Sequence, residues 1–386
     1  MSGKRGEMPS NDRNKRMRFD SSVPHADPEL KRLLCLVDEE IDEKAVIKAI
    51  QKNPSVARAK YKASYLGPDF PLYIAIKRGA SFGVVNAIFR AYPEAVKEKN
   101  SEDETILHGA CRMAAPFEIV SLLWEGWPDA VNRKNRNGQT PLHCACSNHA
   151  SVESVTFLME KCPQALAEKE EMAGQTPLHC ACTFSVSHEV VSFLLKACPT
   201  VVEEKNKFGQ TLLHSMCSIN GNPASLDTLL LLLKYHPEAV RIKDNDGRMP
   251  LHYACKKRVS IDVVTLLLEK NPSAVEEKDI YGETPLHLMC KYCTPAREKM
   301  ILSHVSCLVS NRLDRSVATK MMRDFIEIKW QGGLILLFEL FPLSVTCLNH
   351  IPMSIVPSLL SMMGRHCKIL TMSTMMINRQ DVLNIY

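Results

Sequence analysis

Two short runs of the sequence hold residues that could bind a metal ion or react as thiols. His143-Cys144-Ala145-Cys146 recurs as His179-Cys180-Ala181-Cys182, and His287, Cys290 and Cys293 form a third group. Cysteine thiolates and histidine nitrogens are the usual zinc ligands, so each Cys-x-Cys pair could supply two ligands and a neighbouring segment two more. A zinc site, or a thiol redox sensor that uses Cys144 and Cys180, is therefore the first chemistry to weigh.

The regular recurrence of these residues favours a structural role. Histidine occupies one position in six segments, at His108, His143, His179, His214, His252 and His287. Cysteine follows three residues later, at Cys111, Cys146, Cys182, Cys217, Cys255 and Cys290. Zinc ligands must lie about 2 Å from one ion, whereas residues one repeat apart belong to different structural units. A free cysteine also serves as a small buried apolar residue. We therefore predict no metal site and no cofactor.

The histidines belong to a motif that repeats along most of the chain. Gly-Gln-Thr-Pro-Leu-His stands at 138–143 and again at 174–179, and weaker copies begin at Gly209, Gly247 and Gly282. The threonine position, with Phe70 and Met249 as replacements, falls at residues 70, 105, 140, 176, 211, 249 and 284. The steps are 35, 35, 36, 35, 38 and 35 residues. A near-fixed period of this length predicts stacked units instead of one folded-back core.

Each repeat is predicted to be a turn followed by two helices. Glycine is favoured where a turn needs positive φ, threonine can cap the first helix, and proline fits that helix's first position. A longer apolar run such as 263–268 then predicts a second helix that neighbouring units bury. These runs end before a recurring proline, which cannot continue a helix: Pro54, Pro93, Pro128, Pro163, Pro199, Pro237 and Pro272.

This pattern resembles the ankyrin repeat, whose Thr-Pro-Leu-His-x-Ala signature is matched over about residues 65–310. The resemblance implies an all-α fold: an ankyrin-type helical solenoid with β-turn fingers, here with a diverged helical C-terminal cap. It also implies that each histidine hydrogen-bonds to backbone between units, and that the protein binds other proteins. Two features depart from the family. One extra residue lies between the helices of most repeats, so that Phe82, Phe117, Val152, His188 and Ile261 stand twelve residues after the threonine position, and a Pro-x-Ala-Val ending replaces Gly-Ala-Asp.

We predict four segments along the chain. They are a disordered basic arm (1–27), an N-terminal helical capping unit (28–66), the ankyrin repeat array (67–310) and diverged helical C-terminal units (311–386). Asp42 is the expected N-cap of a helix in the second segment, and Ser316 of a helix in the fourth. Further helices are expected at 296–308, 334–341, 353–363 and 366–377, and a protruding loop at 220–223.

Composition bounds the class of protein. The 386 residues are 45% hydrophobic and 24% charged with a net charge of +5, as in an ordinary folded domain. The polar start does not match a secretory signal, and the apolar run at 333–364 is too interrupted for a membrane span. The cysteines are then expected to be free thiols in a reducing compartment. Nucleotide-binding, kinase and hydrolase motifs are not found, so we predict no enzymatic activity, no direct nucleic-acid binding and no membrane contact.

Two kinds of variable position are expected to face partners: the finger tips and the outward residues at the end of each first helix. Large apolar side chains at positions without a packing role are informative there. We predict a concave face with aromatic anchors and a basic fringe, suited to an acidic or amphipathic segment, and expect Cys144 and Cys180 to face it. The predicted partner-binding residues are Arg112, Met113, Arg136, Asn137, Met172, Phe184, Phe208, Ile219, Lys256, Lys257, Tyr281 and Tyr292.

The sequence therefore predicts a non-enzymatic scaffold or adaptor, monomeric and cytoplasmic, that binds another protein. Two basic clusters, Lys4-Arg5 and Lys15-Arg16-Met17-Arg18, resemble a bipartite nuclear localisation signal. A nuclear regulatory adaptor is for this reason the main alternative, and a thiol redox or zinc sensor is the other. The partner is not encoded by the motif, because function depends on the side chains that such an array presents.

Overall fold

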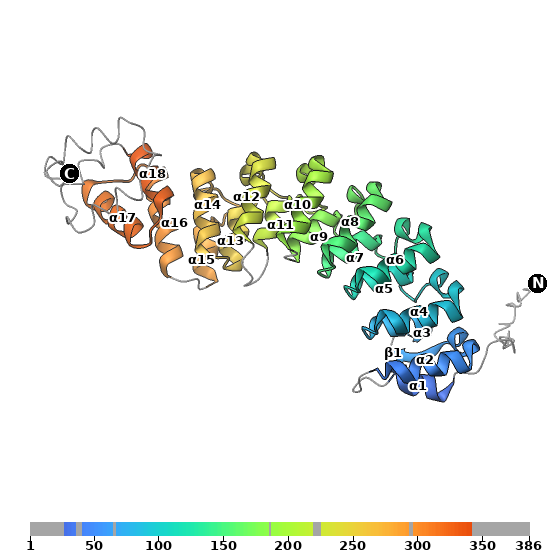
Figure 1. Ribbon diagram of the computed structural model, residues 1–386. Coiled ribbons are helices and arrows are strands. Elements are labelled where there is room, and N and C mark those ends of the chain that lie inside the picture. The colour runs from blue at the N-terminus through green and yellow to red at the C-terminus, as the bar shows by residue number, and fades with distance from the viewer. Residues whose placement is uncertain are drawn as a thin grey trace, which may run out of the picture. The chain divides into compact units, whose positions relative to one another are not determined.

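The described residues form two compact units, one within residues 1–101 and the other within residues 102–386. The computed structural model describes residues 27–35, 41–64, 67–184, 187–218, 225–292 and 296–341. These residues form the helices α1 to α18, short 3-10 turns and one strand pair (Figure 1). The predicted all-α fold class is confirmed.

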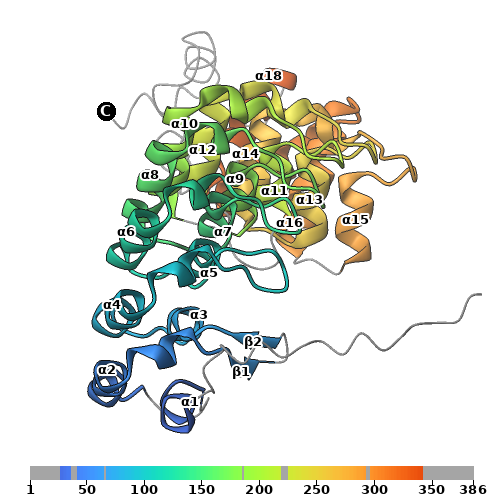
Figure 2. The same cartoon turned by 90° about the vertical axis from the view of Figure 1, so that its right-hand side faces the viewer.

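Unit 1 consists of small helices around an apolar core. Its elements are α1 (Pro28–Cys35), α2 (Glu43–Lys52), η1 (Pro54–Arg58), β1 (Tyr61–Ser64), β2 (Gly67–Asp69), α3 (Pro71–Lys77), α4 (Phe82–Ala91) and η2 (Pro93–Lys97). The strands β1 and β2 pair antiparallel, with Tyr61 opposite Asp69 (Figure 2). Leu30, Val46 and Leu72 are fully buried. As predicted, Asp42 caps α2, and its carboxylate accepts the backbone N–H of Ala45 at 3.0 Å.

Unit 2 is a series of helix pairs. The first helices, here called the inner row, are α5 (Ile106–Arg112), α7 (Pro141–Ser147), α9 (Pro177–Thr183), α11 (Leu212–Cys217), α13 (Pro250–Lys257) and α15 (Pro285–Lys291). The second helices, here called the outer row, are α6 (Phe117–Gly126), α8 (Val152–Lys161), α10 (His188–Ala197), α12 (Leu226–Tyr235), α14 (Ile261–Lys270) and α16 (Ala296–Val309). A last pair, α17 (Arg315–Glu327) and α18 (Gln331–Leu340), follows.

The recurring proline begins a 3-10 turn after each of the first five outer-row helices, α6, α8, α10, α12 and α14. These turns are η3 (Pro128–Asn132), η4 (Pro163–Leu166), η5 (Pro199–Glu203), η6 (Pro237–Arg241) and η7 (Pro272–Val275). Proline fits the first position because its fixed φ suits a helical turn and no backbone N–H is needed there. The alanine and valine that follow, such as Ala130 and Val131, are buried. This packing explains the Pro-x-Ala-Val ending.

The helix starts follow the expected capping rules with one correction. The side chains of Thr105, Thr176 and Thr284 accept backbone N–H groups at the starts of α5, α9 and α15. The prediction of Ser316 as an N-cap is wrong. Asp314 caps α17 instead, because its carboxylate accepts the N–H of Val317 at 2.8 Å.

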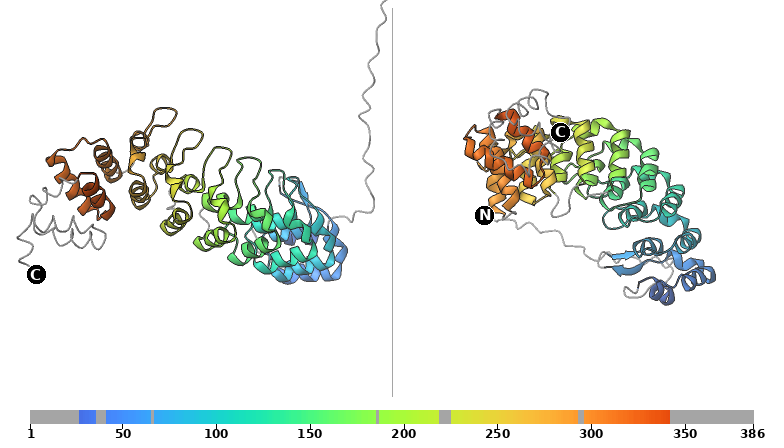
Figure 3. Two further views of the ribbon diagram at one scale, coloured as in Figure 1. Left: turned by 90° about the horizontal axis from the view of Figure 1, so that it is seen from above. Right: turned by 60° about the vertical axis from the view of Figure 1, so that its left-hand side comes forward.

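The inner-row helices of unit 2 pack against one another more closely than the outer-row helices do. The difference curves the stack so that the inner row lies on its concave side. The turns that connect successive pairs project in parallel from one side of the stack (Figure 3). We call these turns the fingers.

The last helix pair of unit 2 packs on the repeat array. The helix α18 contacts α14, and Trp330 donates its indole N–H to Glu269 at 2.6 Å.

Several predictions fall on residues outside those that the structure describes. They concern the basic arm up to residue 26, the loop at 220–223, Ile219, and the helices expected at 353–363 and 366–377. The expected helices at 296–308 and 334–341 correspond to α16 and α18. The segment boundaries at 28, 67 and 311 remain predictions.

Candidate functional site

Each finger of unit 2 is organised by one buried polar side chain. These residues are Asn135, Glu170, Asn206, Asp244 and Asp279. Asp279 is typical, because its Oδ1 accepts the backbone N–H groups of Tyr281 and Glu283, both at 2.9 Å. Such a bond pattern mimics a backbone turn and satisfies donors that would otherwise be unpaired. The buried side chain therefore fixes the backbone of its turn, and the residues at the tip of the finger point away from it.

Backbone hydrogen bonds join each finger to the next. The N–H of Arg136 donates to the carbonyl of Glu102 at 2.9 Å, and that of Ile280 donates to Asp246 at 2.9 Å. Glu171, Lys207 and Asn245 donate in the same way to Asn137, Ala173 and Phe208, at 2.8, 2.8 and 3.0 Å. The finger tips of unit 2 thus form one hydrogen-bonded ladder, which preorganises them for binding.

The recurring histidines fix the fingers to the inner row. His108 accepts the Thr105 backbone N–H at its Nδ1, and its Nε2 lies 3.0 Å from the Gln139 carbonyl of the next repeat. His143, His214 and His252 reach the carbonyls of Gln175, Arg248 and Glu277 in the same way. For these four residues, the bond to backbone between units that the family resemblance implies is present.

Burial keeps these imidazoles neutral. It lowers the pKa of His108, His143, His179 and His214 to about 4 in each case, although hydrogen bonds to backbone carbonyls oppose the shift. For His108, His143 and His214, the neutral tautomer with its proton on Nε2 satisfies both neighbours, because Nδ1 accepts an N–H and Nε2 donates to a carbonyl. A second proton, on Nδ1, would point at the backbone N–H that this nitrogen accepts, so the imidazolium form would lose that hydrogen bond. The histidines therefore act as structural connectors.

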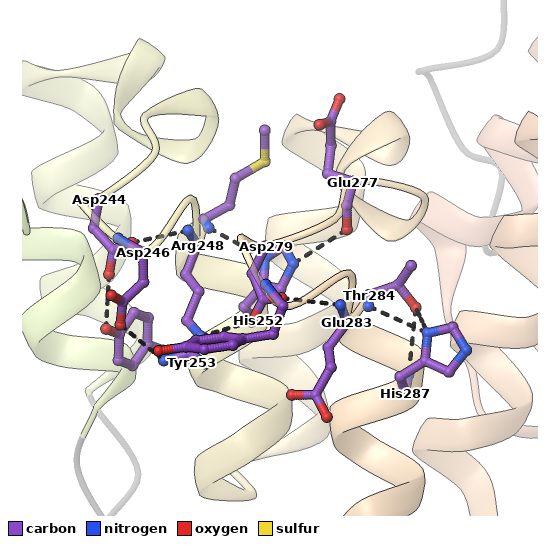
Figure 4. A network of polar contacts seen from close by, with 12 residues as sticks. Asp244, Asp246, Arg248, His252, Tyr253, Glu277, Asp279, Glu283, Thr284 and His287 are labelled. Atoms are coloured by element: carbon purple, nitrogen blue, oxygen red, sulfur yellow. Dashed lines mark hydrogen bonds and ion pairs between the residues drawn. The ribbon is translucent and has the colours of Figure 1, made fainter.

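A polar network centred on Arg248 joins the two fingers that Asp244 and Asp279 organise (Figure 4). Arg248 donates from Nε to Asp279 at 3.0 Å and from Nη1 to Asp246 at 3.1 Å. Its guanidinium carbon lies 5.4 Å from the centre of the Tyr281 ring. Burial opposes ionisation of Asp279, but the N–H groups of Glu283 and Tyr281, together with Arg248, lower the pKa of its carboxyl. The tyrosine is therefore backed on one face by a fixed cation.

Gly138 and Gly282 allow a test of how tightly the fingers pack. Both have positive φ (+74° and +75°), which a side chain makes costly. A Cβ at Gly138 would lie 2.9 Å from the backbone nitrogen of Glu171 in the next finger, whereas one at Gly282 would meet nothing within 4 Å. We expect Gly282→Ala to cost about 1–2 kcal/mol from backbone strain alone and Gly138→Ala about 1–3 kcal/mol more. Urea unfolding measures both, and equal losses would contradict a tightly packed finger ladder.

Most of the apolar residues predicted to bind a partner lie at the surface. The exposed fractions are 72% for Met172, 67% for Tyr281, 55% for Phe208, 49% for Phe184 and 42% for Met113. Tyr292 and Asn137 are half-buried. Met172, Phe208 and Tyr281 stand on fingers, whereas Phe184 follows the end of α9 and Met113 the end of α5. Their role in binding remains a prediction.

The predicted basic fringe divides into two kinds of residue. Arg112 is ion-paired with the buried Glu104, and Arg136 lies 3.6 Å from Glu102. Lys256 and Lys257, at the end of α13, are half-exposed. The first two cations therefore have acidic partners within the protein.

Several exposed residues were not among the predicted partner-binding residues. Ile280, 63% exposed, stands beside Tyr281 on the same finger tip. Arg258 follows the two lysines of α13 in a left-handed conformation (φ 57°). On the outer row, Phe193, Leu226 and Leu230 are also exposed. The register of the repeat places Ile280 at a finger position, and it could also have identified Arg258, which adjoins the predicted Lys257.

The Cys-x-Cys runs do not form a reactive site. Cys144 and Cys180 are buried, so the expectation that they are exposed on the concave surface is wrong. The Arg112 guanidinium lies 3.9 Å from the Cys144 sulfur, and the Gln175 side-chain oxygen lies 3.8 Å from the Cys180 sulfur. Burial raises the pKa of Cys144 to about 12 and that of Cys180 to about 11. Thiols held protonated are weak nucleophiles and weak metal ligands. Within the described ranges no cluster of three or more histidine, cysteine, aspartate or glutamate side chains could hold a metal ion.

Paired helices, hydrogen-bonded fingers and connecting histidines define a helical repeat protein of the solenoid class. Family models for ankyrin repeats match residues 72–168 (ankyrin repeats, three copies), 173–206 (ankyrin repeat) and 231–289 (ankyrin repeats, many copies). The chain belongs to the ankyrin repeat family.

Similarity to individual proteins is more distant. Among solved structures, the chain is similar to the crystal structure of the ankyrin repeat domain of Bcl-3, described as a unique member of the IkappaB protein family. The identity is 23%, the match covers 61% of this chain and 98% of that one, and the TM-score is 0.45. No curated protein matched the sequence. In the part of the chain that the structure describes, no helix is both long and apolar enough to cross a membrane.

Proposed function

We propose that this protein is a non-enzymatic scaffold that binds another protein through the concave side of unit 2. The observation that carries the proposal is the set of large apolar side chains on the finger tips and at the end of α9: Met172, Phe184, Phe208, Ile280 and Tyr281. Apolar side chains that are exposed on a rigid frame are typical of binding hot spots. The buried turn residues and the finger ladder supply that frame.

The proposal is tested by comparing two faces of the same unit. The triple variant Phe184→Ala, Phe208→Ala and Tyr281→Ala removes three aromatic groups from the concave side. Phe193→Ala removes one of similar exposure (44%) from the outer row. Truncation of a hot-spot side chain costs roughly 1–2 kcal/mol or more, so the triple variant should bind partners more than tenfold more weakly.

Affinity purification with quantitative mass spectrometry provides the measurement. Proteins recovered with the wild type and with Phe193→Ala should be lost from the triple variant. Circular dichroism at matched temperature checks that all three proteins are folded. Recovery of the same proteins by the triple variant would reject the concave side as the binding surface.

The basic clusters at residues 4–5 and 15–18 support a second candidate function, that of a nuclear adaptor built on the same array. Paired basic clusters match bipartite import signals. Imaging of a fluorescent fusion with and without residues 1–20 separates the two functions. Nuclear accumulation that depends on residues 1–20 supports the nuclear adaptor, and an unchanged distribution supports the cytoplasmic scaffold.

A further inference from the structure

The positive charge of the concave side is concentrated at one place. Arg112 and Arg136 have acidic partners, and Lys291 at the end of α15 pairs with Glu283 at 2.8 Å. Lys256 and Lys257, with Arg258 directly after them, have no carboxylate within 4 Å among the described residues. We call these three residues the α13 cation cluster.

Helix stability alone does not explain the α13 cation cluster. Cations at a helix C-terminus interact favourably with the helix dipole. However, the position that Lys256 occupies, seven residues after the threonine position, holds the uncharged residues Ser147, Thr183 and Ser218 in three other repeats. A cationic end is therefore not needed to terminate an inner-row helix.

Arg258 stands at the turn that follows α13. It adopts the left-handed region (φ 57°, ψ 45°), as Gly79, Ala114 and His149 do at the same position of their repeats. Its guanidinium donates to the carbonyl of Tyr292, beyond the end of the neighbouring helix α15. This bond holds the guanidinium close to the inner-row ends of two adjacent repeats.

The α13 cation cluster lies at a definable distance from the apolar anchors. Phe184 and Lys257 occupy the same position in their repeats, each eight residues after Thr176 and Met249 respectively. The helices α9, α11 and α13 pack in succession. Packed helices lie about 8–10 Å apart, which places the two positions roughly 16–20 Å apart. An extended peptide spans that distance with about five or six residues at roughly 3.3 Å each.

We propose that the concave side binds a peptide segment of a partner protein at two places. An apolar group packs on Phe184, and a cluster of aspartate or glutamate residues five or six positions away pairs with the α13 cation cluster. This proposal rests on the proposed function and adds the chemistry and spacing of the partner. A nucleic acid is a poorer fit, because duplex and single strands need basic residues spread along the whole groove, and Arg112 and Arg136 already have acidic partners.

Selection from a phage-displayed library of random twelve-residue peptides tests the proposal on the full chain. The wild type should enrich peptides with two or more acidic residues, four to seven positions from a leucine, phenylalanine or tryptophan. Synthetic peptides of the enriched sequence, labelled with fluorescein, then give Kd values by anisotropy. Lys256→Glu with Lys257→Glu should weaken binding more than tenfold and remove most of its salt dependence.

The matched control reverses two lysines on the outer row, Lys161→Glu with Lys196→Glu, and should select and bind the same peptides as the wild type. Enriched peptides without acidic residues, lost on Phe184→Ala, would overturn the charge assignment but leave the proposed function intact. Peptides whose affinity survives Phe184→Ala but not the lysine reversal would overturn the two-part assignment alone. Peptides whose affinity survives both variants, or a selection no better than that of an unrelated helical protein, would overturn both. Urea unfolding of each variant confirms that a lost affinity is not lost folding.

Discussion

Lowering the pH from 7 to 5 is expected to destabilise the folded protein by several kcal/mol. The pKa of His108, His143, His179 and His214 is about 4 in the folded state because these residues are buried, against about 6.5 in an unfolded chain. Between these values the unfolded state binds more protons than the folded state, so stability rises with pH and is lost as the pH falls. At pH 5 the loss is about 2 kcal/mol for each histidine.

Urea unfolding at half-unit steps from pH 5 to 7.5 measures this loss. The free energy of unfolding should fall on acidification with a slope that approaches about 1.4 kcal/mol per pH unit for each of the four histidines. His143→Asn keeps a donor and an acceptor but cannot titrate. The variant should have a lower free energy of unfolding at pH 7. Its free energy of unfolding should also change less steeply with pH, because one fewer proton is taken up on unfolding. A flat profile in the wild type would contradict the neutral connector role of the histidines.

The repeat architecture was predictable because its signals lie within each repeat. Threonine caps, the proline at the first helical position and the proline after each second helix act on the residues beside them. Phe117, Val152 and Ile261, which stand twelve residues after the threonine position, are the first residues of α6, α8 and α14. The motif also occurs seven times at a near-fixed spacing, so a weak helix signal in one repeat is supported by the stronger signals in the others.

The features that were missed depend on neighbours in space or on competition between adjacent residues. Asp314 and Ser316 are both good caps, and only the course of the backbone decides that Asp314 binds Val317. Cys144 was expected to face the concave surface, yet it is buried, and Arg112 of the preceding repeat lies 3.9 Å from its sulfur. The pairing of Arg112 with Glu104 is equally invisible in a pattern of single residues.

The candidate site was predictable as a set of positions but not as a charged surface. The family register places Phe184, Phe208 and Tyr281 outward, and the structure leaves all three exposed. Which cations remain available depends on ion pairs with carboxylates up to 34 residues away in sequence. The concentration of charge on α13 therefore emerges only once those partners are assigned.

Leu142→Ala is expected to lower the free energy of unfolding by about 2–5 kcal/mol. Leu142 is 1% exposed on α7, which packs between α5 and α9, so the substitution leaves a cavity that two neighbouring repeats share. In a stacked array each repeat is stabilised mainly by its neighbours, and a cavity at such an interface weakens both contacts. Leu267→Ala on α14, at 2% exposure, should cost a similar amount.

Met172→Ala provides the matched control, because it also truncates a large apolar side chain in unit 2. Met172 is 72% exposed on a finger tip, so its removal should change the free energy of unfolding by no more than roughly 0.5 kcal/mol. Urea unfolding of the three variants at pH 7 gives the comparison. Equal losses at Leu142 and Met172 would mean that the register separating buried from partner-facing positions is wrong, and the proposed binding surface would fall with it.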